Sequence, residues 1–351
     1  MHNNLLIAII KAQINEIDCK LVEQLILEAK MKYERIAGTN IDSSVLLFGT
    51  AELGGLHDEK ESFELLDAYF EAGGNHLDSG LCYSVWRGGQ GASERMIGKW
   101  LDARGLRDKV IVATKGVMPE APDFVKSRMN KKCLESDIRE SMRNLGTDHI
   151  EIYYVHRDDM TLPAEEIISM LHKYTDSGDI GYIACSNWRA ERVAKANEYA
   201  RSIGKPGFIC VENLWNFAHM NPEKNESHLV IMNDDTEQIE AFRKLGVAIA
   251  PFTPLAWGYF DKILKNGEEN LPEVTKKRYH NDISMKRAKR VGEVSKKLGC
   301  TPVQLNLAMF LNMDMQILPI VACKSREQLS GLLGSMDIPL DRQTIDHIIN
   351  G

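Results

Sequence analysis

The sequence predicts an α/β protein built as a (β/α)8 barrel. Eight short apolar runs rich in β-branched residues have the character of parallel strands that are buried on both faces. Segments with helical periodicity lie between these runs. A chain of 351 residues without a Pro- or Ser-rich linker is long enough for one such barrel.

The predicted elements alternate along the chain. The strands are expected at residues 45–48, 75–77, 110–114, 150–155, 180–185, 208–211, 247–250 and 317–321. Helices between them are expected, for example, at residues 62–72, 93–103, 131–145, 163–177, 190–202 and 236–245. Gly146 and Gly246 follow two of these helices and Pro163 opens another, which are ordinary helix end signals. Residues 255–282, rich in Gly, Asn, Lys and Glu, predict a long loop.

Composition excludes several classes of protein. Apolar residues make up 44% and charged residues 26%, as in a globular protein, and the net charge of −7 disfavours nucleic acid or an acidic membrane as a partner. Seven dispersed cysteines without a CxxC pair favour reduced thiols in a cytoplasmic protein over a disulfide framework or a metal site. The apolar stretch at residues 5–10 is too short for a membrane span and has no basic residue before it, unlike a signal peptide.

Four polar residues follow or end predicted strands and are the candidate catalytic residues. They are Asp78 and Tyr83 in GGNHLDSGLCYS, Lys115 in VIVATKG and His156 in IEIYYVHRDD. The carboxyl ends of barrel strands open onto one face, so residues spread over about eighty positions are expected to meet there. An acid, a phenol, an amine and an imidazole brought together in this way would form a proton-transfer site.

The motifs around these residues resemble the aldo/keto reductase family, from about Met31 to the C-terminus. GGNHLDSG is similar to the family's GxNxxDTA signature, and YYVHRDD is similar to the YLLHRPD form of many bacterial members. ATKG, ACSNW, APFTPLAWGYF and PIVACKSREQL resemble further family segments in the same order. The resemblance implies a barrel oxidoreductase that transfers a hydride between a nicotinamide cofactor and a carbonyl compound.

The resemblance also implies a role for each candidate, and the chemistry of the side chains supports it. A tyrosine has a pKa near ~10 and is a poor proton donor unless its phenolate is stabilised. Lys115 would lower the pKa of Tyr83, the general acid, and Asp78 would hold Lys115 in place. His156 would donate a hydrogen bond to the carbonyl oxygen.

Nicotinamide contacts are likewise implied by the resemblance. Ser186 and Asn187 match the pair that holds the carboxamide, and Phe252 matches an aromatic residue that stacks on the ring. The family usually has Gln where this chain has Glu212, and a carboxylate cannot donate to the carboxamide oxygen unless it is protonated.

The phosphate and adenosine contacts are expected near the last barrel helix. Lys324 and Ser325 open that segment, and a lysine beside backbone donors suits a 2′-phosphate, so NADP is favoured over NAD. Gln328 would lie along the adenosine. Leu332 and Ala322 replace an Asn and a Gly of the family pattern, so this part of the pocket departs from it.

Two functions remain open at the level of sequence. One is an NADP-dependent oxidoreductase acting on an aldehyde, ketone or sugar-like carbonyl, and the other is a nicotinamide-binding regulatory subunit with little turnover. The four candidate catalytic residues favour the enzyme. Substrate choice is expected to depend on the loops at residues 83–91, 216–234 and 255–282.

Residues 1–30 form an N-terminal extension ahead of a barrel at residues 31–351, because the family resemblance already includes a short hairpin just after Met31. Ile14, Ile17, Leu21 and Leu25 recur at helical spacing. The extension is either an added helix that packs on the barrel or on a second subunit, or the product of a misassigned start with translation beginning at Met31. We favour the hypothesis that it is dispensable.

Overall fold

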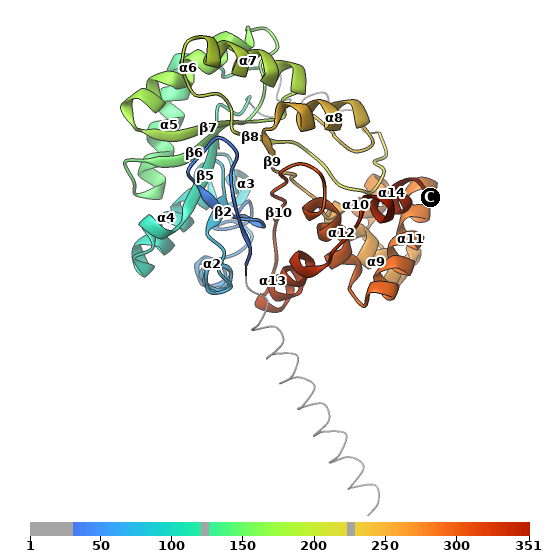
Figure 1. Cartoon of the computed structure of the whole chain (residues 1–351). Coiled ribbons are helices and arrows are strands. Elements are labelled where there is room, and N and C mark those ends of the chain that lie inside the picture. The colour runs from blue at the N-terminus through green and yellow to red at the C-terminus, as the bar shows by residue number, and fades with distance from the viewer. Residues whose placement is uncertain (1–30, 121–125, 223–228) are drawn as a thin grey trace, which may run out of the picture.

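The computed structural model describes residues 31–120, 126–222 and 229–351. Within these residues the chain forms a curled sheet of eight parallel strands with helices packed around its outside (Figure 1). The strands follow the order β10-β3-β4-β5-β6-β7-β8-β9, so chain neighbours are also neighbours in the sheet. The predicted extension, residues 1–30, lies outside the described residues.

All eight predicted strands are confirmed, each within a few residues of its expected position. Their bounds are β3 (Leu47–Gly49), β4 (His76–Asp78), β5 (Ile111–Gly116), β6 (Ile150–Val155), β7 (Ile180–Ser186), β8 (Cys210–Glu212), β9 (Ala248–Ile249) and β10 (Ile320–Val321).

Hydrogen bonds also link the first and last members of this strand order. The amide of Leu318 donates to the carbonyl of Ile249, and the amide of Ile320 donates to the carbonyl of Pro251. These bonds bring the segment before β10 against β9. The architecture is therefore consistent with the predicted (β/α)8 barrel.

Helices connect the strands and cover the outside of the sheet. They are α2 (Glu59–Glu71), α3 (Val85–Gly88), α4 (Ala92–Arg104), α5 (Lys131–Leu145), α6 (Ala164–Ser177), α7 (Ala190–Ser202), α8 (Thr236–Leu245), α9 (Tyr259–Asn266), α10 (Glu273–Tyr279), α11 (Asp282–Leu298), α12 (Pro302–Leu311), α13 (Arg326–Leu333) and α14 (Arg342–Asn350). The six helices predicted in the first part of the chain are confirmed to within about three residues at their starts.

Local sequence explains where these helices begin and end. The side chain of Asn130 accepts a hydrogen bond from the amide of Cys133 and starts α5, and Gly146 ends it in the left-handed conformation at φ 67°. Thr301 and Gln304 form a reciprocal capping box at the start of α12.

One sequence prediction is wrong: residues 255–282 are largely helical rather than a long loop. They contain η2 (Ala256–Gly258), α9, η3 (Glu268–Asn270) and α10, and α11 begins at Asp282. Tyr259 and Phe260 are buried in the main hydrophobic core, and burying this apolar surface stabilises short helices that the Gly- and Asn-rich composition obscured.

The strands divide the core into an interior and an outer layer, because successive side chains of a strand point to opposite faces. Ala113, Ile152, Ala184 and Cys210 belong to a cluster inside the curled sheet. The other faces pack against the helices in two larger clusters.

A short antiparallel hairpin precedes the sheet, as predicted for the residues after Met31. It consists of β1 (Tyr33–Arg35) and β2 (Asp42–Ser44). Ile36, in its turn, is completely buried in the interior cluster, and the amide of Ala37 donates to the side chain of Gln316. The hairpin therefore covers the amino-terminal end of the strands and leaves the carboxyl-terminal end for the site.

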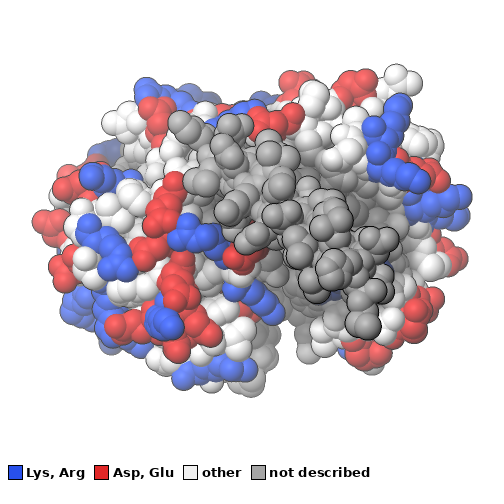
Figure 2. All heavy atoms as spheres, turned by 90° about the horizontal axis from the view of Figure 1, so that it is seen from below, with Lys and Arg blue, Asp and Glu red and all other residues white. Residues whose placement is uncertain are grey.

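The described surface carries both signs of charge. Lys and Arg side chains are interspersed with Asp and Glu on the face seen in Figure 2. Among the described residues, no helix has the length and apolar character needed to cross a membrane.

Candidate active site

The candidate residues gather at the carboxyl-terminal ends of the strands because they share one face of the alternation. Lys115 lies two residues beyond Ala113, and Glu212 lies two residues beyond Cys210, both of which belong to the interior cluster. His156 follows Tyr154 of the same cluster in the same way. Their side chains therefore point toward the axis of the curled sheet, as catalytic residues of this architecture do.

Lys115 is at the centre of the site and is completely buried. Its Nζ donates hydrogen bonds to Oδ1 of Asp78 at 2.6 Å and to the carbonyl of Ser79 at 2.7 Å. A second carboxyl oxygen, Oε2 of Glu212, lies 3.1 Å from the same nitrogen. The predicted pair of Asp78 and Lys115 is present, and Glu212 joins it.

Tyr83 stands on the loop between β4 and α3. Its amide donates to the carbonyl of Gly80, and a side chain at Gly80 would meet the Tyr83 ring at 3.1 Å, so the close approach of this ring favours glycine there. Lys115 Nζ lies 4.8 Å from the centre of the ring, and the Tyr83 hydroxyl lies 3.5 Å from Oδ2 of Asp78. The phenol is thus in contact with the buried ion pair.

The electrostatics of this cluster differ in one respect from the simple sequence prediction. Burial raises the pKa of Tyr83 well above its ordinary value; Lys115 lowers it, as predicted, while Asp78 and Glu212 raise it. Burial lowers the pKa of Lys115, but the same two carboxyl groups outweigh burial and hold that pKa well above its ordinary value. Lys115 therefore stays protonated. Its lowering of the pKa of Tyr83 is opposed by both carboxyl groups, which raise that pKa.

His156 faces the Tyr83 ring edge-on, with ring centres 6.0 Å apart. Burial lowers the pKa of His156 well below its ordinary value, and the positive charges of Arg157 and Lys115 lower it further. The imidazole is therefore neutral near pH 7. Sγ of Cys82 lies 3.6 Å from its Nδ1, which leaves Nε2 as the nitrogen free to face a substrate.

The three residues predicted to contact nicotinamide, together with Glu212, lie at or just beyond the carboxyl-terminal ends of the neighbouring strands β7, β8 and β9. Ser186 ends β7 in register with Glu212 of β8, and the amide of Asn187 donates to the carbonyl of Glu212 at 2.9 Å. Nδ2 of Asn187 donates to Oγ of Ser186, and Phe252 is half-buried beyond β9. The structure brings Ser186, Asn187 and Glu212 together beside Lys115.

The predicted phosphate residues surround the start of α13. Ser325 is its N-cap and accepts a hydrogen bond from the amide of Gln328, whose side chain in turn accepts one from the amide of Lys324. No contact within the described residues joins this group to Asp78, Tyr83, Lys115 or His156. Lys324, Ser325 and Gln328 therefore form a group of their own at the start of α13.

The sequence analysis missed two residues near these groups. Lys262, on α9, is close enough to Lys324 that the second positive charge lowers its pKa, after burial, which lowers it most. Lys262 was obscured because its segment was interpreted as a loop. Arg157 was treated only as part of the motif around His156, although its guanidinium is largely buried and its Nε has no hydrogen-bond partner among the described residues.

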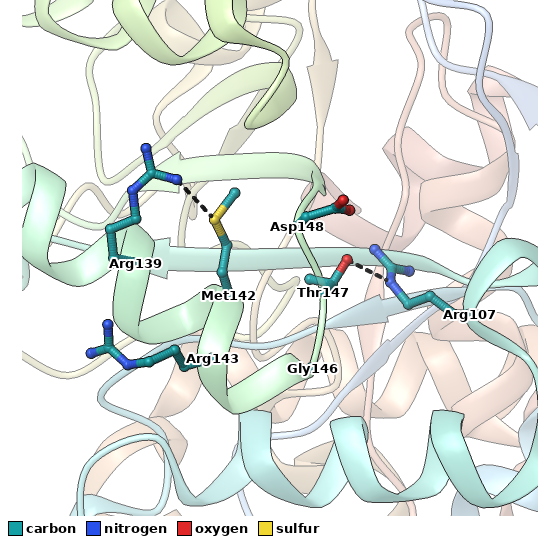
Figure 3. A pocket seen from close by; sticks show the side chains of 7 residues that line it. All are labelled: Arg107, Arg139, Met142, Arg143, Gly146, Thr147 and Asp148. Carbon is teal, nitrogen blue, oxygen red and sulfur yellow. Dashed lines mark hydrogen bonds between the residues drawn. The ribbon is translucent and has the colours of Figure 1, made fainter.

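A surface hollow lies away from these residues, beside the start of β6 (Figure 3). Arg107, Arg139 and Arg143 are among the residues that line it. Arg107 already pairs with Glu151 at 2.6 Å, and Arg139 pairs with Asp179. We assign no function to this hollow.

A family model describes most of this chain. The model of the aldo/keto reductase family matches residues 45–349, which include the whole sheet and the site. The protein belongs to the aldo/keto reductase family. It is accordingly an oxidoreductase, in agreement with the prediction from its motifs.

Several curated relatives are similar over most of their length. An aryl-alcohol dehydrogenase (NADP(+)) of Phanerodontia chrysosporium is 29% identical over 84% of this chain and 76% of its own. Norsolorinic acid reductase stcV of Emericella nidulans is 29% identical over 89% and 79%. The uncharacterized oxidoreductase YrpG of Bacillus subtilis is 28% identical over 90% and 94%.

Proposed function

We propose that this aldo/keto reductase uses NADPH to reduce an aldehyde, ketone or sugar-like carbonyl, with Tyr83 as the proton donor. The observation that carries the proposal is the contact between the phenol of Tyr83 and the buried pair of Lys115 and Asp78. A bound nicotinamide cofactor would supply the hydride. The remaining chemistry, delivery of a proton to the carbonyl oxygen, falls to the side chains of this chain.

Tyr83 and Lys115 divide that task. Tyr83 releases its proton as negative charge develops on the substrate oxygen, and the ammonium of Lys115 stabilises the phenolate that remains. Asp78 holds the ammonium at 2.6 Å and keeps it charged. In the reverse direction the same phenolate takes a proton from an alcohol.

His156 orients the carbonyl oxygen. When the thiol of Cys82 donates to Nδ1, the neutral imidazole carries its hydrogen on Nε2, and in this tautomer Nε2 can donate to the same oxygen that Tyr83 protonates. Two donors aimed at one oxygen stabilise the charge that forms there in the transition state.

The nicotinamide residues fit an amide-bearing ring. Ser186 and Asn187 carry side-chain donors and acceptors at the strand ends, and Phe252 offers an apolar face nearby. Glu212 fits as well, because its pKa is raised to about 8, first by burial and then by the charge of Asp78. A protonated Glu212 can donate to a carboxamide oxygen as a glutamine would.

The start of α13 fits the phosphates. Lys324 and Lys262 place two positive charges near one another, and Ser325 opens a helix whose amino end favours anions. Two lysines beside a helix start can hold a pyrophosphate together with a 2′-phosphate, which supports NADPH over NADH. Gln328, one turn into the helix, is available to the adenosine.

Aromatic carbonyl compounds are the first substrates to test. Trp86 is 75% exposed three residues beyond Tyr83, and Trp257 is 48% exposed on η2, where it meets Tyr279 edge-on. Exposed indoles on these short helices suit flat substrates. Two of the relatives described above also bear names that refer to an aryl alcohol and to norsolorinic acid.

The proposal is tested by following NADPH oxidation at 340 nm over a panel of aromatic aldehydes, aliphatic ketones and open-chain sugars, with NADH run in parallel. We expect turnover of at least one carbonyl class with NADPH, and its loss in the Tyr83→Phe protein. Tight NADPH binding without oxidation of any member of the panel would contradict the proposal and favour the regulatory alternative.

A further inference from the structure

Lys115 is held by two buried carboxyl groups rather than one. Asp78 accepts a hydrogen bond from its Nζ at 2.6 Å, and Oε2 of Glu212 lies 3.1 Å from the same nitrogen. The side chains of Asp78 and Glu212 are each 3% exposed and that of Lys115 is fully buried. A single buried lysine therefore lies between carboxyl groups from β4 and β8, on opposite sides of β5.

The two carboxyl groups engage the lysine differently. The donors of Lys115 are directed to Asp78 Oδ1 and to the carbonyl of Ser79, and Oε2 of Glu212 makes the longer contact, 3.1 Å from Nζ. The charge of Lys115 lowers the pKa of Glu212 first and a hydrogen bond between the two side chains lowers it further. An interaction of this kind depends directly on whether Glu212 carries a proton.

Charged and titratable groups reach Glu212 from β4, β5, β6 and β8 and from the loops after β4 and β6, so its ionisation is coupled to theirs. They are Asp78, Tyr83, Lys115, Tyr154, Arg157 and Cys210. Burial and Asp78 raise the pKa of Glu212 to about 8, against the lowering by Lys115 and Arg157. Burial also raises the pKa of Asp78, against the lowering by Lys115, so proton binding by the two carboxyl groups is linked through the ammonium that lies between them.

We propose that Glu212 is a positioning residue for Lys115 and that its ionisation controls how much of the lysine's charge is available to Tyr83. When Glu212 is protonated, Asp78 alone opposes the ammonium. When Glu212 ionises, a second negative charge faces both the ammonium and the phenol, and Tyr83 becomes a weaker acid. Carbonyl reduction should then decline as the pH rises through the ionisation of Glu212. The inference deepens the proposed function and rests on it for its effect on turnover.

The coupling itself can be measured without a substrate. Protein labelled with ¹³C at the side-chain carboxyl of glutamate gives a resonance for Glu212, assigned by its loss in Glu212→Gln and, as a second variant, in Glu212→Asp. We expect this resonance to titrate near neutral pH or above. The midpoint should rise in Lys115→Met, which removes the cation, and fall in Asp78→Asn, which removes the like charge. A midpoint near the ordinary value for glutamate, unchanged by both substitutions, would overturn the proposal.

The pH profile of the reduction separates this positioning role from a contact with cofactor alone. In Glu212→Gln the basic limb of the kcat profile should move to higher pH by about one unit, because the charge that opposes Lys115 is gone. The matched control is Glu151→Gln, which removes a carboxylate from the opposite end of β6, where it pairs with Arg107 at 2.6 Å, and should leave the limb in place.

An altered Kd for NADPH with an unmoved basic limb in Glu212→Gln would likewise overturn the inference. The proposed function would fail in a different way, by an absence of turnover across the carbonyl panel. In that case the carboxyl titration still decides whether the pKa of Glu212 depends on Lys115.

Discussion

The ammonium of Lys115 lies 2.6 Å from Oδ1 of Asp78, and neither side chain is more than 3% exposed. Two opposite charges so deeply buried stabilise the fold only as a pair, because each alone would carry the full cost of leaving water. Lys115 of this pair also lies against the ring of Tyr83. The ion pair therefore contributes both to the stability of the fold and to the environment of the proposed proton donor.

Replacing one member of this pair should destabilise the protein. Lys115→Met leaves Asp78 and Glu212 facing each other without a cation, and we expect a loss of about 3–5 kcal/mol in the free energy of unfolding. Urea denaturation of Lys115→Met, Asp78→Asn and the double variant gives the coupling energy. If the single losses simply add in the double variant, the two residues do not act as a pair.

Residual activity of Lys115→Met should also titrate at higher pH, since the charge that lowers the pKa of Tyr83 is lost.

Tyr83→Phe should abolish carbonyl reduction while leaving NADPH binding nearly intact, because only the proton donor is removed. Fluorescence titration with NADPH and steady-state kinetics measure the two quantities. Tyr182→Phe is a matched control, since the hydroxyl of Tyr182 donates to Asn40 near the other end of the strands. Near-normal turnover in Tyr83→Phe would refute the assignment of the general acid.

Lys324→Ala should weaken NADPH binding far more than NADH binding, because the proposed partner of Lys324 is the 2′-phosphate. The ratio of the two Kd values, measured by calorimetry, is the decisive quantity. Lys289→Ala, which removes an exposed lysine 4.0 Å from Glu293 on α11, should change neither Kd. Equal losses for both cofactors would remove the case for NADPH specificity.

Glu212 should make the protein less stable as the pH rises. Its pKa in the folded protein, about 8, lies above the ordinary value of 4.5 that the unfolded chain keeps. The folded state therefore binds the proton more tightly, and this stabilisation is complete below about pH 4.5 and is lost as the pH rises through about 8. Melting temperatures of the parent and Glu212→Gln proteins between pH 5 and about 9 test this. The melting temperature of the parent should fall relative to that of the variant as the pH rises across that range. A constant difference between the two melting temperatures would count against the raised pKa of Glu212.

We also expect a chain beginning at Met31 to fold and to keep full reductase activity. The hairpin of β1 and β2 begins at Tyr33, and Ile36 in its turn belongs to the interior cluster. Melting temperature and turnover of the two chain lengths are the measurements. Aggregation of the shorter chain would show that residues 1–30 belong to the working protein.

Sequence alone predicted the eight strands, the bounds of six helices and the four candidate catalytic residues. Continuous apolar runs and helix end signals are local, so they can be recognised in a run of ten or fifteen residues. Lys115 is an example: its place just after the apolar run at residues 110–114 predicted that it lies at the carboxyl end of a strand. The helices between residues 255 and 282 were not recognised, because burial of Tyr259 and Phe260 by distant parts of the chain stabilises them.

Only the tertiary structure decided the electrostatics of the site. Glu212 and Lys115 are about a hundred positions apart in the sequence. No local sequence pattern predicts that Oε2 of Glu212 lies 3.1 Å from the ammonium of Lys115. The approach of Lys262 to Lys324 likewise depends on how α9 and the segment before α13 pack over the strand ends. Sequence specifies which groups are present and which way a strand points them; distance and burial, which set their pKa values, exist only once the chain has folded.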